Sequence, residues 1–154
     1  MRIAVDAMGG DYAPEDVVRG SVAGAREYDA GIILVGPEEK IKFELAKYDT
    51  SGLDITILHT DEYLVEGEAP AYALRTKRNA SIALTVKLVK EGKAAAAISN
   101  GPTGGVVTSA LMILGTLEGI SRPIAGGEFC GFAPDTVVLD IGGNLDCRPD
   151  QLLD

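Results

Sequence analysis

Residues 2–18, RIAVDAMGGDYAPEDVV, predict a strand, a loop and a helix in succession. The first five residues are typical of a short buried strand, and the glycine-rich loop 7–14 follows its carboxyl end. Pro14 suits the first turn of a helix, and the next two acids match the positive end of the helix dipole. The helix carries an apolar stripe made of Val17, Val18, Val22 and Ala25.

The same alternation continues along the chain and predicts a three-layer α/β/α fold with a mostly parallel sheet. We expect a loop over 60–70 and a helix from about Ala80 to Glu91, with Asn79 as its N-cap. The strand predicted at Ala94–Ser99 looks enclosed on both faces. Further strands are predicted at Ile32–Val35, Ile55–Leu58 and Thr136–Ile141, and further helices at Glu38–Tyr48 and 106–117.

We expect residues 1–154 to form a single α/β domain. Pro149 and Asp150 are a strong helix start, but the chain ends within the first turn of that helix. This pattern predicts a fragment, or a protein that lacks a second half.

The chain is acidic, with 14 Lys and Arg against 23 Asp and Glu and a net charge of −9. This balance argues against nucleic acid as a partner and against simple electrostatic attachment to anionic lipid. The most apolar stretch, Val106 to Leu117, is shorter than the roughly 20 residues that cross a bilayer. The start MRIAVD contains an acid and is unlike a signal peptide, so we expect a soluble, cytoplasmic protein.

Residues 71–93 depart from this acidity, because they carry six Lys or Arg against the single acid Glu91. A helix face that meets water explains such a run. The alternative is a docking surface for an acidic partner or a phosphorylated ligand, formed by Arg75, Lys77 and Arg78.

Residues suited to metal binding or nucleophilic catalysis are sparse. Cys130 and Cys147 lack metal-ligand spacing and His59 is the only histidine, so we expect no metal site. His59 follows a predicted strand, where it acts as a general acid or base or as a structural side chain. Cys147 beside Arg148 is expected to be an unreactive thiol, and no Ser–His–Asp set can be assembled.

Three glycine-rich loops, 7–14, 99–105 and 142–149, leave the carboxyl ends of predicted strands, where open α/β sheets bind ligands. In the loop 99–105, glycine N–H groups and a following helix N-terminus suit an anion, with Thr103 as a hydroxyl donor. The segment Met8–Asp11 offers backbone N–H groups in the same way, and Asn144 with Asp146 forms a donor–acceptor pair. Each loop is equally explained as a tight turn without a ligand.

Six segments together resemble the phosphate acyltransferase family over essentially the whole chain. They are residues 2–18, 59–62, 75–81, 99–105, 119–123 and 138–149. The resemblance implies an enzyme that moves a long acyl chain from acyl carrier protein to inorganic phosphate, giving acyl phosphate for phospholipid synthesis. It also implies a fold like that of isocitrate and isopropylmalate dehydrogenases and phosphotransacetylases, no cofactor, a homodimer, and peripheral association with the membrane. The resemblance implies as well that the chain is the amino-terminal half of a longer, two-lobed enzyme.

The implied chemistry is attack of a phosphate oxygen on a thioester carbonyl, for which oriented N–H groups matter more than a nucleophilic side chain. The resemblance then assigns catalytic or organising roles to Asp11, Asn144 and Asp146. Arg75, Lys77 and Arg78 would meet the acidic carrier protein or the phosphate. The resemblance also implies that phosphate is contacted by Gly9, Gly10, Gly101, Thr103 and Gly104.

The chain departs from the family pattern at Tyr12, where histidine is usual, and at Pro102, which removes a backbone donor. Ala69 and Ala80 stand where Glu and Ser are common. These changes keep a second interpretation open, a non-catalytic module that binds an anion or a carrier protein. A third is a phosphotransacetylase-type enzyme for small acyl thioesters, which a lack of an apolar groove beside loop 99–105 would favour.

Overall fold

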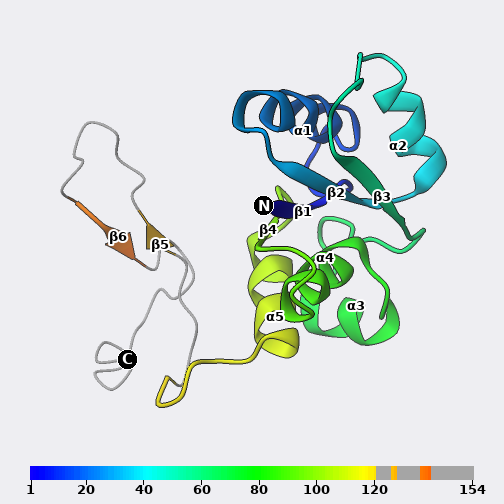
Figure 1. Ribbon diagram of the computed structural model, residues 1–154. Helices are drawn as coiled ribbons and strands as arrows, with labels where there is room; N and C mark the ends of the chain where they lie inside the picture. Colours follow the sequence, from blue (N-terminus) through cyan, green and yellow to red (C-terminus); the bar gives the residue numbers. More distant parts are fainter. Residues whose placement is uncertain (121–125, 128–135, 140–154) are drawn as a thin grey trace. The chain divides into compact units, whose positions relative to one another are not determined.

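The computed structural model describes residues 1–120, 126–127 and 136–139 and divides the chain into two compact units (Figure 1). The unit Met1–Leu114 contains a four-stranded sheet, and the unit Gly115–Asp154 contains a two-stranded sheet. In the latter, β5 (Gly126–Gly127) pairs antiparallel with β6 (Val138–Leu139). Part of the strand predicted at 136–141 is therefore confirmed, but its partner runs antiparallel.

The four-stranded sheet is entirely parallel, with the order β3-β2-β1-β4. Ile33 of the central strand β2 aligns with Ala4 of β1 and with Thr56 of β3. The strands are β1 (Arg2–Asp6), β2 (Gly31–Gly36), β3 (Ile55–His59) and β4 (Ala96–Ile98). The helices of this unit are α1 (Glu15–Tyr28), α2 (Glu38–Leu45), α3 (Pro70–Thr76), α4 (Ser81–Lys90) and α5 (Thr103–Ile113).

Helices cover both faces of this sheet, which confirms the predicted three-layer α/β/α architecture (Figure 1). Because side chains alternate along a strand, neighbouring residues of β2 enter different cores. Leu34 packs with α1 and α2 on one face, and Ile33 and Val35 pack with α4 on the other. A third cluster joins α4 to α3 and α5.

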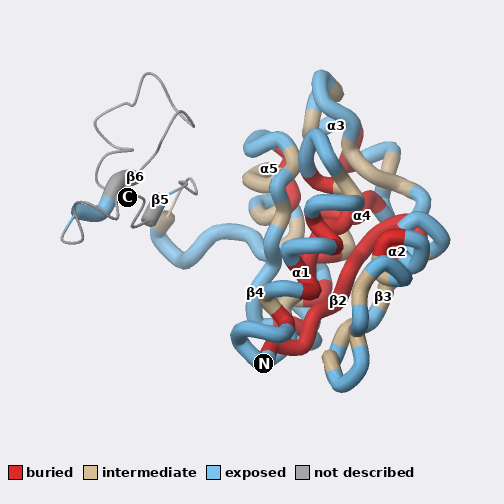
Figure 2. Tube along the Cα trace, turned by 90° about the horizontal axis from the view of Figure 1, so that it is seen from above, coloured by how far each residue is buried: buried red, intermediate tan, exposed pale blue. Residues whose placement is uncertain are grey.

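Strand β4 corrects one expectation from the sequence. Figure 2 shows β2 buried along its whole length, whereas β4 is exposed. Ile98 keeps 47% of its surface accessible. An alanine run fits an enclosed strand, but β4 forms an edge of the four-stranded sheet and pairs there with β1 alone.

Several helix boundaries also differ from the predicted ones. Asn79 is not the N-cap of α4, because that position is Ala80 and no side chain caps the helix. The backbone N–H of Asn79 instead donates to Glu62. Helix α3, which begins with Pro70 at its first position, was not predicted. None of the helices in residues 1–120 is long and apolar enough to cross a membrane.

Candidate functional site

The candidate site lies where the connections of the sheet reverse direction. After β1 the chain moves through β2 to β3 on one side, whereas β4 pairs with the other side of β1. Loops that leave β1 and β4 at such a switch point frame the usual ligand crevice of open α/β sheets. The structure thus places two of the three predicted glycine-rich loops side by side. The third loop, with Asn144, Asp146 and Cys147, lies outside the described residues, as does Cys130.

Gly9 and Gly10 allow these two loops to approach closely. A Cβ on Gly9 would lie 2.6 Å from Ser99 Oγ and 2.7 Å from the Gly101 nitrogen. Gly10 has a φ of 110°, a conformation that favours glycine, and a Cβ there would lie 3.3 Å from Asn100 Cβ. The predicted phosphate-site residue Gly9 is therefore packed against the neighbouring loop.

Asp6, at the end of β1, joins the two loops by hydrogen bonds. The residue is buried, with 4% of its surface accessible. Its Oδ1 accepts from the Met8 N–H at 3.1 Å, and its Oδ2 accepts from the Ser99 hydroxyl at 2.8 Å. Ser99 Oγ in turn accepts from the Gly101 N–H at 3.1 Å. Neither Asp6 nor Ser99 was predicted as a site residue from the sequence. The signal was an acid ending an otherwise apolar strand.

A surface cavity of about 240 Å³ opens over the two loops and reaches the start of α5. Four predicted site residues line it: Gly10, Asp11, Gly101 and Thr103. Gly9 and Gly104 do not line it. A Cβ on Gly104 would lie 3.3 Å from Pro70 of α3. The remaining lining residues are Met8, Leu64, Glu66, Asn100 and Pro102.

Two backbone N–H groups at the start of α5, of which that of Thr103 belongs to a residue lining the cavity, lack an acceptor among the described residues. Within the described part of the chain, the N–H groups of Thr103 and Gly104 have no acceptor, while the Gly105 N–H donates to the Pro102 carbonyl. A helix N-terminus adds a partial positive charge to such donors. No Lys or Arg among the described residues lines the cavity, and the carboxylates of Asp11 and Glu66 do. Anion binding here would therefore depend on backbone N–H groups.

Only part of the predicted basic docking surface is available for a partner. Lys77 Nζ donates to Glu68 at 2.7 Å and to the Tyr63 carbonyl at 3.0 Å, so it holds the preceding loop on α3. Hydrogen bonds from Lys77 and from the Val65 N–H lower the pKa of Glu68 below its usual value. Arg75 and Arg78 are exposed, and neither forms an ion pair or side-chain hydrogen bond within residues 1–120.

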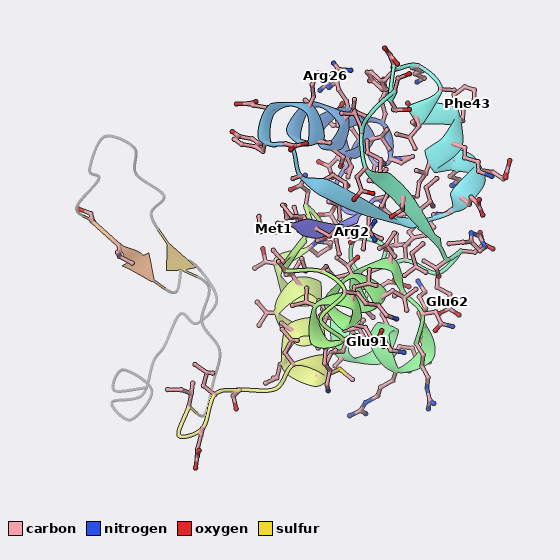
Figure 3. The ribbon with its side chains drawn as sticks, viewed as in Figure 1. Met1, Arg2, Arg26, Phe43, Glu62 and Glu91 are labelled. Atoms are coloured by element: carbon pink, nitrogen blue, oxygen red, sulfur yellow. The ribbon has the colours of Figure 1, made fainter. Side chains whose placement is uncertain are left out.

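The remaining lysines of the basic segment serve α4 and its neighbours. Glu91 lies just beyond the end of α4 (Figure 3). Lys87 and Lys93 approach its carboxylate at 3.9 Å and 2.7 Å. Lys90 Nζ donates to the Ile113 carbonyl near the end of α5. These contacts support the simpler interpretation, a solvated helix face, for this half of the segment.

His59 has a structural contact at the end of β3. Its Nδ1 accepts the N–H of Glu38, the first residue of α2, at 3.2 Å, and its Nε2 lies 3.5 Å from Asp61. An acceptor at this position satisfies one of the free N–H groups that begin a helix. The geometry therefore favours the structural interpretation of His59. No cluster of potential metal ligands occurs among the residues that the structure describes.

An apolar groove of about 660 Å³ lies between α1 and the strands β1 and β4, and one end reaches Asn100. Val5, Val17 and Ile98 contribute apolar surface, and Gly20 and Gly24 leave space along α1. Asn100 also lines the cavity over the loops. An apolar groove is thus present beside loop 99–105. The absence of such a groove would have favoured an enzyme for small acyl thioesters. Tyr12 belongs to neither site and is 75% exposed.

Comparison with known proteins gives a consistent picture. A family described as fatty acid synthesis protein matches residues 1–154. The chain is 44% identical over 153 residues to a phosphate acyltransferase from Pelotomaculum thermopropionicum, covering 99% of this chain and 44% of that protein. It is 48% identical over 152 residues to a phosphate acyltransferase from Moorella thermoacetica, with the same two shares.

A solved phosphotransacetylase from Streptococcus pyogenes is also similar, with a TM-score of 0.59 and 28% identity. That similarity covers 82% of this chain and 41% of the other. The chain thus spans less than half the length of the curated relatives and of the solved structure described here.

Proposed function

This chain belongs to the fatty acid synthesis protein family, and we propose that it provides the phosphate-binding part of an acyltransferase. The enzyme moves a fatty acyl group from acyl carrier protein to inorganic phosphate and gives acyl phosphate for phospholipid synthesis. The observation that carries this proposal is the cavity at the β1/β4 switch point, where the free N–H groups of Thr103 and Gly104 begin α5.

The reaction needs orientation and charge stabilisation more than a nucleophilic side chain. A phosphate oxygen attacks the thioester carbonyl carbon, the new O–C bond forms, the C–S bond breaks, and the released carrier thiolate takes up a proton. Negative charge develops on the carbonyl oxygen during the attack, and fixed N–H donors stabilise it. The Thr103 hydroxyl and N–H supply donors where that residue lines the cavity, and the Gly104 N–H follows at the next position of α5.

The other predicted residues keep distinct roles in this proposal. Asp11 orients the loop that follows β1 and lines the same cavity, with Gly10 beside it. Asn144 and Asp146 are proposed to act from the third glycine-rich loop. Gly9 and Gly101 contribute by letting the first two loops meet, because a Cβ on Gly9 would lie 2.7 Å from the Gly101 nitrogen and a Cβ on Gly101 would lie 3.5 Å from the Gly9 Cα.

A long acyl chain is a better substrate in this proposal than a small acyl group. The apolar groove along α1 meets the anion cavity at Asn100, so apolar surface continues from the reacting end. Burial of each additional methylene favours binding by about 0.8 kcal/mol. We expect transfer to be faster from a long-chain acyl carrier protein than from its acetyl form.

The exposed pair Arg75 and Arg78 is the proposed contact for the acidic carrier protein. Opposite charges raise association rates, and the effect weakens with salt. The double variant Arg75→Glu/Arg78→Glu should raise KM for the carrier substrate at low salt and leave KM for phosphate unchanged. Lys87→Glu is the matched control, because that lysine already lies beside Glu91. Homodimer formation and peripheral membrane association are further parts of this proposal.

Two features favour a second candidate, a module that binds an anion without catalysis. Pro102 borders the cavity and has no N–H to offer, and Tyr12 stands in place of the family's usual histidine. Such a module would bind phosphate saturably and release no thiol from the acyl carrier protein.

Two measurements test the proposal together. Phosphate should shift the amide signals of Thr103 and Gly104 saturably in NMR spectra of this chain. The gene product that carries the chain should release thiol from acyl carrier protein only when phosphate is present. Thr103→Ala should weaken phosphate binding, whereas Thr108→Ala, the same change farther along α5, should not. Saturable binding without turnover supports the second candidate, and an absence of both refutes the proposed function.

A further inference from the structure

The buried carboxylate of Asp6 is a charged group that the proposed chemistry does not use. A buried carboxylate is stable only when hydrogen bonds replace its lost water. Asp6 obtains two such bonds, one from the backbone of its own loop and one from Ser99, which is 93 positions away in the sequence. The carboxylate therefore joins the segment after β1 to the segment after β4.

The Ser99 hydroxyl extends this connection into the second loop. It donates its proton to Asp6 Oδ2 and accepts the Gly101 N–H, so one oxygen atom fixes both a carboxylate and a peptide plane. The same oxygen lies only 2.6 Å from the position that a Cβ on Gly9 would take, which leaves little room for an alternative arrangement. Hydrogen bonds to an ionised acceptor are stronger than those between neutral groups.

We propose that Asp6 and Ser99 are positioning residues that set the distance between the two loops of the phosphate site. This inference rests on the proposed function. We call the hydrogen-bonded set of Asp6, Ser99 and the Gly101 N–H the clamp. In this proposal the Gly101 N–H donates to Ser99 rather than to phosphate, so Gly101 acts as a part of the clamp. Pro102 follows immediately and begins the turn into α5. Fixing Gly101 therefore also fixes the direction of the free Thr103 and Gly104 N–H groups.

The clamp has a consequence that does not depend on phosphate. In the wild-type chain, the amides of Met8 and Gly101 should exchange slowly with solvent, because both donate to side-chain acceptors. Ser99→Ala removes the acceptor of Gly101 and leaves that of Met8. Exchange should then accelerate at least tenfold at Gly101 and change little at Met8.

Phosphate binding and kinetics provide the functional test. Displacement of a reacting group by about 1 Å costs about a hundredfold in rate, so we expect Ser99→Ala to lower kcat/KM for phosphate ten- to hundredfold. In this chain, the Kd for inorganic phosphate should rise about tenfold. Ser109→Ala is the matched control. Its hydroxyl is fully buried and has no partner among the described residues, so phosphate affinity should stay within twofold.

A double-mutant cycle separates the clamp from two independent structural effects. Asp6→Asn keeps an oxygen for the Met8 N–H but removes the acceptor for the Ser99 proton. If Asp6 and Ser99 act on phosphate binding only through their shared hydrogen bond, the double variant should lose no more phosphate affinity than Ser99→Ala alone. Additive losses would contradict the clamp. Should Asp6→Asn fail to fold, the exchange and affinity data for Ser99→Ala decide the matter.

The outcomes distinguish this inference from the proposed function. Unchanged exchange at Gly101, or phosphate affinity within twofold of wild type in Ser99→Ala, overturns the clamp while the wild type still binds phosphate. A wild type that neither binds phosphate nor turns over refutes the proposed function. The clamp as a site-positioning device falls with it, and the exchange data then report only a structural bond.

Discussion

Replacing Gly9 with alanine is the most direct way to perturb the contact between the loops. The new Cβ would lie 2.6 Å from Ser99 Oγ and 2.7 Å from the Gly101 nitrogen, where ordinary contacts begin at 3.4 Å. One neighbour is backbone, and the other is held by Asp6, so the loops must separate by most of an ångström. Overpacking costs about 1–3 kcal/mol, and a weakened bond to a charged acceptor costs about 1.5–3 kcal/mol. We expect the free energy of unfolding to fall by about 3 kcal/mol.

Urea unfolding followed by circular dichroism measures this change. With a slope of about 1.5 kcal/mol per molar urea, the midpoint should fall by about 2 M. Gly20→Ala in the exposed middle of α1 is the control, because among the described residues no atom outside the adjoining helix backbone lies within 4 Å of its added Cβ. Helix propensity should raise stability there by up to about 1 kcal/mol. A Gly9→Ala protein as stable as the wild type, to within about 0.5 kcal/mol, would refute the reasoning about the close approach.

Three further changes probe other parts of the fold. His59→Ala removes the acceptor of the Glu38 N–H and should cost about 1 kcal/mol in thermal unfolding, with phosphate affinity unchanged. Glu68→Gln should remove the part of the pH dependence that comes from its bond to Lys77. Because the pKa of Glu68 is lowered from 4.5, its ionised form stabilises the folded state above that pH, and this contribution disappears as the pH falls through the lowered value. The Tm curves of variant and wild type should therefore converge on acidification, and parallel curves would contradict this. Leu34→Ala should cost about 3–5 kcal/mol in urea unfolding, since Leu34 is fully buried between β2 and its helices.

The layers of the fold were predictable because each strand and its helix carry a local pattern. The apolar run of β2 and the apolar stripe of α1 can each be recognised as buried from a few neighbouring residues, without reference to the rest of the chain. Helix α3 was missed because it is short and begins with Pro70 directly after an acidic, loop-like stretch. Strand β4 was misjudged because alanine suits a buried or an exposed position equally well.

The candidate site was predictable in its loops but not in its connections. A glycine-rich loop followed by a helix start is a local pattern that indicates an anion site. Gly10, Gly101 and Thr103 were predicted as site residues because they belong to such loops. The bond from Ser99 to Asp6 joins residues 93 positions apart, and no local pattern encodes such a pairing. Likewise, a run of positive charge does not reveal that Lys77 is already bound by Glu68.

The exposed edge of β4 affects how the protein behaves at high concentration. Ala96, Ala97 and Ile98 present a short apolar edge that belongs to the four-stranded sheet and pairs there only with β1. Such an edge is a template on which strands of other molecules can add, and natural proteins commonly block it with a lysine. Ala97→Lys should therefore suppress concentration-dependent aggregation in light scattering, so this position is a practical one for preparing soluble protein.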